Sequence, residues 1–156
     1  MEVYDAGAAA RSNFLEGYNC SQSVYMALAP LVGVDRISAA RTAAFLGGGV
    51  CRTREMCGAV LGMLMACGDA AGNADGADQD AKGRNYQDGR DLMNCFREKF
   101  GSITCRELLG IDPDKKESAK PEARTEEYYR SRPCPGFIDF AARIGQEYID
   151  FEKNDQ

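Results

Sequence analysis

Apolar residues recur every three or four positions along most of this chain, and this spacing predicts helices because such residues share one helical face. No segment alternates between apolar and polar residues as a half-buried β-strand does. The predicted helices cover residues 3–16, 19–31, 38–46, 54–70, 86–100 and 105–109, and a last one begins at Pro135. We therefore expect an all-α fold, an irregular bundle of about five to six helices in a single domain over residues 1–156.

Two segments lack this periodicity. Residues 68–83 are rich in glycine, alanine and aspartate and are expected to form a loop. Residues 112–132 are charged and interrupted by Pro113 and Pro121, so we expect a surface excursion that contains one helical turn. Such a run of charge is typical of a solvated face, and a segment that docks a partner is the alternative interpretation.

Small side chains line one face of the helix expected over residues 54–70. Gly58, Gly62 and Ala66 recur every four residues along it. A ridge of such small side chains lets a second helix approach closely. We therefore expect a neighbouring helix to pack against this face at short range.

Composition restricts the kinds of partner. The chain has 156 residues, 44% of them hydrophobic, and a formal net charge of −5, so its surface repels nucleic-acid phosphates and anionic lipid. Its first residues lack the basic start and apolar run of a signal peptide, and the longest apolar stretch, residues 59–67, is too short to cross a bilayer. We expect a cytoplasmic protein that neither inserts into membranes nor binds nucleic acid.

Cysteine is frequent and histidine is absent: the chain has seven cysteines and no histidine. An odd number of cysteines cannot pair completely within one chain, and a reducing cytoplasm disfavours structural disulfides. Without histidine, the chain alone supports neither a Ser-His-Asp triad nor a zinc site with histidine ligands. Any site for a soft metal or for nucleophilic chemistry must therefore use thiolates.

Four of the cysteines fall at expected helix starts. Cys20, Cys57 and Cys105 lie in first helical turns, and Cys134 directly precedes Pro135. Unpaired N–H groups and the helix dipole stabilise a thiolate at such positions, and arginines close by in sequence act in the same direction, so we expect lowered thiol pKa values. The alternative is that each cysteine is simply a small buried apolar residue.

That simpler interpretation suits Cys67 and Cys95, which lie among apolar helix residues. Cys51 is ambiguous, because it lies in the glycine-rich turn before Cys57 and is able to join a site there. No CxxC pair occurs in the chain, so neither a zinc ribbon nor a thioredoxin-type dithiol is indicated. Distant cysteines form a common site only if the fold brings them together.

Several short motifs follow one another in a characteristic order. They are Asn19-Cys20-Ser21-Gln22, Gly47-Gly48-Gly49, Cys57-Gly58-Ala59-Val60-Leu61-Gly62, Phe100-Gly101-Ser102 leading to Cys105-Arg106-Glu107-Leu108-Leu109-Gly110, and Cys134. Over about residues 10–150, this order resembles the C_GCAxxG_C_C family of redox-active proteins. The resemblance implies that the four family cysteines are Cys20, Cys57, Cys105 and Cys134, whereas Cys51, Cys67 and Cys95 lie outside the family pattern.

The resemblance also carries expectations about chemistry. Family members come mostly from anaerobic bacteria and archaea, and some lie near transporter genes. A similar domain forms part of split-Soret cytochromes, for which an iron–sulfur centre has been suggested. This chain has no CxxCH motif, so covalently attached haem is not expected.

The first hypothesis for function is electron transfer or redox sensing by an iron–sulfur centre, most simply [2Fe–2S], on the four family cysteines. Gly48, Gly49 and Gly58 would let backbone N–H groups approach the sulfur atoms and tune the potential. Zinc on the same four thiolates is the nearest variant, because tetrahedral sulfur suits both. An unidentified redox partner protein is expected, and the oligomeric state is open.

Two other classes of function compete with this one. A metal-free protein would cycle between dithiol and disulfide, with Cys57 as the attacking thiol. An interaction module without chemistry would merely bury its cysteines and dock a partner through residues 112–132.

Overall fold

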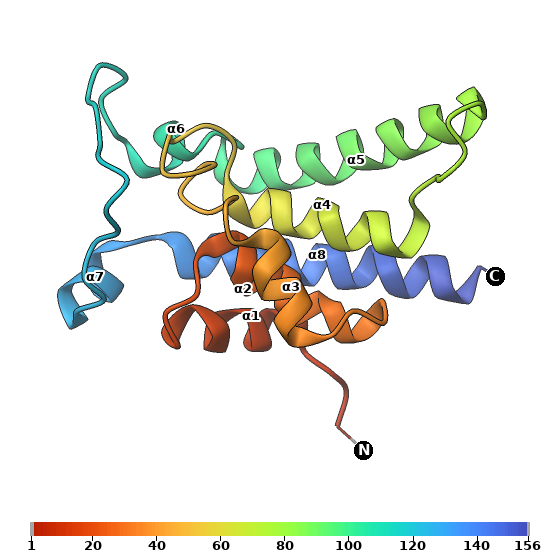
Figure 1. Cartoon of the computed structure of the whole chain (residues 1–156), viewed down its shortest axis with the longest axis horizontal. Coiled ribbons are helices and arrows are strands. Elements are labelled where there is room, and N and C mark those ends of the chain that lie inside the picture. The colour runs from red at the N-terminus through yellow and green to blue at the C-terminus, as the bar shows by residue number, and fades with distance from the viewer. Residues whose placement is uncertain (1, 156) are drawn as a thin grey trace.

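Helices make up all the regular secondary structure of residues 2–155, the part of the chain that the computed structural model describes (Figure 1). In chain order the elements are α1 (Ala6–Leu15), α2 (Cys20–Leu28), the 3₁₀ turn η1 (Ala29–Leu31), α3 (Arg36–Ala43), α4 (Gly58–Ala71), α5 (Gln79–Phe100), α6 (Cys105–Leu109), α7 (Glu126–Ser131) and α8 (Cys134–Asn154). The described residues form no β-strand, only an isolated antiparallel bridge between Met56 and Thr104. The all-α prediction is confirmed, with eight α-helices in place of the five to six expected. None of the helices in this range is long and apolar enough to cross a membrane.

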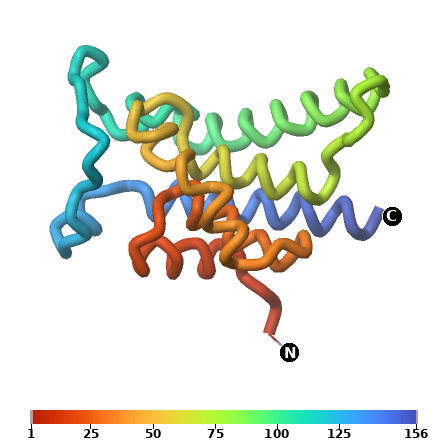
Figure 2. Tube along the Cα trace, in the orientation of Figure 1, coloured from red at the N-terminus to blue at the C-terminus, as the bar shows by residue number. Residues whose placement is uncertain are grey.

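Four helices, α1, α2, α4 and α8, surround one hydrophobic core, and α3 and α5 lie outside them (Figures 1 and 2). Their backbones approach closely because small residues lie at the contacts. A Cβ at Gly62 of α4 would stand 2.6 Å from the carbonyl oxygen of Ser21 in α2, and one at Gly145 of α8 would stand 2.8 Å from Leu28. The ridge of small residues expected on α4 is thus confirmed, and α2 is the helix that packs against it.

Three phenylalanines join the C-terminal end of α5 to the start of α8. Phe100 contacts Phe137 edge to face with ring centroids 4.8 Å apart, and Phe96 lies 4.9 Å from Phe100. Phe96 is completely buried. This cluster brings the end of α5 next to the start of α8, and α6 follows α5 after a few residues; α6 and α8 each begin with a cysteine.

Two predicted helix starts were wrong by four residues or more. α4 begins at Gly58 rather than at residue 54, because Arg54 has a left-handed φ of 63°, which interrupts a right-handed helix. α5 begins at Gln79 rather than at residue 86, and the Asp78 carboxylate caps it by accepting a hydrogen bond from the N–H of Ala81. The loop expected over residues 68–83 is therefore confined to 72–78. Because residues 68–83 contain many glycines, the sequence did not reveal that this segment includes the end of α4 and the start of α5.

The connection between α3 and α4 contains a run of left-handed residues. Those with φ between 53° and 71° are Gly48, Gly49, Val50, Cys51, Arg52 and Arg54. A non-glycine residue in this conformation costs roughly 1–2 kcal/mol. Hydrogen bonds from the N–H groups of Arg54 and Glu55 to the carbonyls of Gly48 and Gly49, 3.0 and 2.8 Å long, hold the turn closed. Strain of this kind persists only where the surrounding structure imposes it.

Residues 111–132, here termed the strap, run along the end of the molecule that lies opposite the C-terminus (Figure 2). The strap contains one short helix, α7, as the sequence predicted. It leaves α6 and returns to the start of α8, so its two ends are anchored close to Cys105 and Cys134.

Candidate functional site

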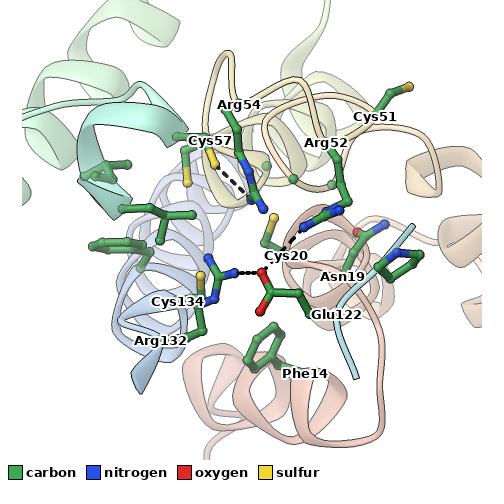
Figure 3. Close-up of a pocket in the computed structure, with 18 of the residues that line it drawn as sticks. Phe14, Asn19, Cys20, Cys51, Arg52, Arg54, Cys57, Glu122, Arg132 and Cys134 are labelled. Carbon is green, nitrogen blue, oxygen red and sulfur yellow. Dashed lines mark hydrogen bonds and ion pairs between the residues drawn. The ribbon is translucent and has the colours of Figure 1, made fainter. Parts of the chain in front are cut away.

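Four helix N-termini meet at the strap end of the molecule, and each carries a cysteine. Cys20, Cys105 and Cys134 are the first residues of α2, α6 and α8, and Cys57 is the N-cap residue of α4. All four line one cavity of about 520 Å³. Figure 3 shows Cys20, Cys57 and Cys134 around this cavity, contributed by three different helices. The structure thus brings together the four residues that the sequence singled out.

Local sequence explains how each cysteine is placed at a helix start. The Asn19 side chain accepts a hydrogen bond from the N–H of Gln22, and the Gln22 side chain accepts one from the N–H of Asn19, so this capping box starts α2 at Cys20. Hydrogen bonds between distant segments align the other starts. The Cys57 N–H donates to Ile103 (2.8 Å), and the Cys105 N–H donates to Glu55 (2.6 Å).

Glycines permit the close approach of these segments. A Cβ at Gly58 would overlap the Cys20 sulfur and would stand 2.9 Å from the carbonyl oxygen of Leu46. A Cβ at Gly49 would stand 2.7 Å from the Cβ of Cys105. Gly48 lines the cavity itself. Gly48 and Gly58 therefore line the cavity, and Gly58 and Gly49 directly face Cys20 and Cys105.

The remaining cysteines lie elsewhere. Cys51 is exposed at the rim of the cavity, with its thiol 3.3 Å from the carbonyl oxygen of Phe45, and Figure 3 shows this side chain directed away from the cavity. Cys67 is buried in the second half of α4, and Cys95 is exposed on α5. Neither Cys67 nor Cys95 lines the cavity.

Burial controls the thiol pKa values, and the lowered values expected from the helix starts were wrong for three cysteines. Burial raises the pKa of Cys57, and the charge of a Cys20 thiolate adds to this rise. Burial also raises the pKa of Cys105, against the opposing effect of a hydrogen bond from Arg54. It raises the pKa of Cys134 to about 12, and again Cys20 contributes. In the absence of metal, these three thiols are neutral at pH 7.

Arginine is the dominant charged residue of the cavity wall. The four arginines that line it are Arg52, Arg54, Arg124 and Arg132. Arg54 donates a hydrogen bond to the Cys105 sulfur (3.7 Å) and forms an ion pair with Glu117 (2.5 Å). Burial by itself lowers the pKa of Arg54, but the contacts with Glu117 and Cys105 outweigh burial and raise it, so this side chain is charged.

The strap lies over the cavity, where some of its charged side chains contact the rest of the protein. Its Glu117 side chain is only 9% exposed and pairs with Arg54, which is 6% exposed. Its Glu122 pairs with Arg52 and Arg132. Arg124 donates hydrogen bonds to the backbone of α1 and of the turn after it, and it lies over the ring of Phe14 at 4.3 Å. Glu117, Glu122 and Arg124 thus attach the strap, whereas most of its other charged residues are exposed, as expected of a solvated charge run.

The described residues form no ready-made binding site for a single metal ion. Within residues 2–155, no three cysteine, aspartate or glutamate side chains are close enough together to hold one metal ion. A tetrahedral zinc site with bonds of about 2.3 Å requires its sulfur atoms to lie roughly 3.8 Å apart.

The site contains residues that sequence reasoning did not assign to it. Arg52, Arg54 and Arg132 were noticed only as neighbours of cysteines in sequence, and Glu117 and Glu122 were not connected with the cysteines at all. Arg54 and Glu117 lie 63 positions apart. No local pattern signals such a pair, although the number of arginines beside cysteines is a usable hint.

Comparison with known proteins identifies the class. The sequence matches the family described as "Putative redox-active protein (C_GCAxxG_C_C)" over residues 18–148. The chain therefore belongs to this family, as its motifs indicated. Searches of curated proteins and of solved structures gave no match.

Proposed function

We propose that this protein transfers electrons or senses redox state through an iron–sulfur cluster, [2Fe–2S] in its simplest form, held by Cys20, Cys57, Cys105 and Cys134. The observation that carries the proposal is the excess of positive charge around the four thiols. Four arginines line the cavity, and two glutamates, Glu117 and Glu122, pair with them. These six side chains therefore carry a net excess of two positive charges.

A cluster on four thiolates supplies the missing charge. Its oxidised core carries two positive charges and the thiolates carry four negative ones, so the whole centre bears two negative charges. Charges removed from water need such compensation. A disulfide is neutral and would leave the arginines unbalanced. Metal binding also removes thiol protons, so the raised pKa values of the cysteines do not oppose ligation.

A cluster accepts more widely spaced thiols than a single zinc ion does. A cluster binds its cysteines through more than one iron, so their sulfur atoms stand farther apart than the ligands of one ion. The absence of any preformed single-ion group in residues 2–155 agrees with such spacing. The reactive-thiol alternative is less well supported, because Cys57 is 5% exposed and burial raises its pKa.

The protein's own groups would stabilise negative charge on the sulfur atoms. The N–H groups of Ala59 and Val60 act to lower the pKa of Cys57, in opposition to burial, and Arg54 donates a hydrogen bond to the Cys105 sulfur. Such donors raise the reduction potential of a sulfur-ligated centre. When bound, the cluster would supply one-electron transfer. A redox partner protein and a reducing cytoplasm, which keeps thiols available as ligands, are parts of this proposal.

The test is an anaerobic purification followed by iron, sulfide and zinc analysis and a visible absorption spectrum. We expect iron and sulfide in equal amounts and visible bands that bleach on reduction. Cys105→Ser should lose both, whereas Cys95→Ser, at an exposed position outside the cavity, should retain them. A colourless wild-type protein without iron would reject the cluster and favour dithiol chemistry.

A further inference from the structure

Glu122 of the strap lies between two arginines at the cavity, where it occupies the position of a bound carboxylate. Its Oε1 pairs with Arg132 and, at 3.5 Å, with Arg52 (Figure 3). The Glu122 side chain is 46% exposed, whereas each arginine is only 16% exposed. We infer that the two arginines form a binding site for the carboxylate of a small organic acid, and that Glu122 fills this site when no ligand is bound.

Both arginines are held in place by contacts other than Glu122. Arg52 donates hydrogen bonds to the backbone carbonyls of Ser118, at 2.8 Å, and Lys120. The Arg132 guanidinium lies over the ring of Tyr128 at 5.3 Å. The pair therefore keeps its arrangement when Glu122 swings into solvent. Such preorganisation reduces the cost of binding a ligand.

A different glutamate of the strap holds it in place, so Glu122 can leave the two arginines while the strap stays closed. Glu117 is nearly buried and is held by Arg54 through two contacts, of 2.5 and 3.4 Å. This buried ion pair therefore holds the strap in place. Glu122, half exposed and bound through one oxygen, can exchange with another carboxylate while Glu117 keeps the strap closed.

The cavity suits a small organic body. Its volume of about 520 Å³ lies within the range of small-molecule sites, which is about 300–1,000 Å³. Apolar side chains make up much of its wall, namely Phe14, Leu108, Leu109, Pro121, Tyr128 and Phe137. A monocarboxylate also carries the same charge as Glu122, so the exchange preserves the charge balance of the cavity. Inorganic phosphate has neither an organic body to fill the cavity nor the fixed single charge of a monocarboxylate.

The ligand would lie beside the thiols. Arg132 and Arg52 line the same cavity as the four family cysteines, and Arg132 is only two residues from Cys134 in the chain. A carboxylate on Arg132 is therefore close to the proposed centre, and the inference names a class of substrate or effector for it. That role rests on the proposed function, whereas binding of the carboxylate does not require the metal.

Equilibrium dialysis of the anaerobically purified full-length protein against radiolabelled benzoate tests the site. Wild-type protein should bind benzoate, and Glu122→Ala should bind it about fivefold more tightly because the competing carboxylate is gone. Arg132→Gln should weaken binding at least about tenfold. Glu126→Ala, an exposed position on α7, is the control and should match wild type. Glu122→Gln replaces Glu122→Ala if the latter does not fold.

Three results would overturn the inference: absence of benzoate binding to both wild type and Glu122→Ala, weaker binding by Glu122→Ala, or equal competition by neutral benzamide. More effective competition by inorganic phosphate than by benzoate would reject an organic ligand. The assay reads binding, not electron transfer, so it separates the two proposals. Benzoate binding by a protein that contains no iron would retain this site and reject the cluster, and iron without benzoate binding would do the reverse.

Discussion

Cys57 and Cys67 lie at the start and in the second half of α4, are 5% and 8% exposed, and both have a pKa raised mainly by burial. Their neighbours differ. The charges of Cys20 and Cys105 act on Cys57, whereas Cys67 has the carboxylates Asp88 and Glu152 nearby. Burial and pKa direction therefore do not identify the functional cysteine of this pair. What distinguishes Cys57 is that other thiols and arginines surround it.

The two ends of the bundle differ in the same way. Around the second half of α4, polar groups are matched in pairs, with Tyr25 donating to Asp69 (2.5 Å) and Tyr148 to Asp88 (2.7 Å). At the strap end, arginines outnumber their carboxylate partners and the backbone adopts left-handed conformations. A regular, internally satisfied bundle thus supports a strained, positively charged end, which is typical of a functional site.

The largest contrast should appear when the two cysteines of α4 are replaced. Cys57→Ser removes a proposed ligand and should reduce the iron content at least about tenfold. Cys67→Ser should retain the iron and lower the free energy of unfolding by only about 1 kcal/mol. Metal analysis and urea denaturation measure both effects. Equal iron loss in the two variants would remove the distinction between the cysteines.

A second contrast uses two glycines of α4. Gly58→Ala should destabilise the protein by about 2–3 kcal/mol, because its Cβ would overlap the Cys20 sulfur and stand 2.9 Å from Leu46. Gly68→Ala has open space around its Cβ and should stabilise by up to about 1 kcal/mol through helix propensity. Urea denaturation of the two variants measures the difference. Similar denaturation midpoints for the two variants would show that the segments around Gly58 can move apart to accommodate a Cβ.

The strap should depend on its buried ion pair. Glu117→Gln leaves the Arg54 charge without its carboxylate, so we expect trypsin to cleave the strap at Lys115 or Lys116 about tenfold faster. Glu126→Gln, an exposed position in α7, is the matched control and should leave the cleavage rate unchanged. Unaltered cleavage of Glu117→Gln would mean that other contacts hold the strap.

The same pair predicts a pH dependence. The hydrogen bond from Arg54 holds the pKa of Glu117 below its ordinary value of 4.5. Because the folded pKa is lower than the unfolded one, the stabilisation is complete above pH 4.5 and is lost as the pH falls through the folded value. The difference in unfolding free energy between wild type and Glu117→Gln should therefore be constant from about pH 7 to 5 and shrink below about pH 4. A difference that shrinks already near neutral pH would contradict this assignment.

The smallest effect is expected at Val50, which we compare with a buried valine of α4. Val50 has a φ of 71°, which is strained for a β-branched residue. Val50→Gly should therefore stabilise the protein by about 1 kcal/mol. Val60 in α4 is completely buried, so Val60→Gly should have the opposite sign, a loss of about 3 kcal/mol. Thermal denaturation of the two variants checks this, and destabilisation by Val50→Gly would show that its side-chain contacts outweigh the strain.

Much of the fold was predictable because helices leave local signals. The apolar spacing placed the start of α2 within one residue, and the small-residue ridge of α4 correctly indicated a close helix contact. The failures also have local causes. The start of α5 was hidden by glycines at 83 and 89, which lie inside the helix. The start of α4 was misplaced because nothing in the sequence reveals the left-handed conformation of Arg54.

By itself, the sequence determined the helical periodicity, the absence of histidine, and four cysteines at or next to helix starts. These features depend on residue type and on spacings of a few positions. Only the tertiary structure decided that the four starts line one cavity, that burial raises the pKa of Cys57, and that Arg54 pairs with Glu117. Such features depend on the packing of all helix faces at once, because desolvation and charge pairing act between neighbours in space that lie far apart along the chain.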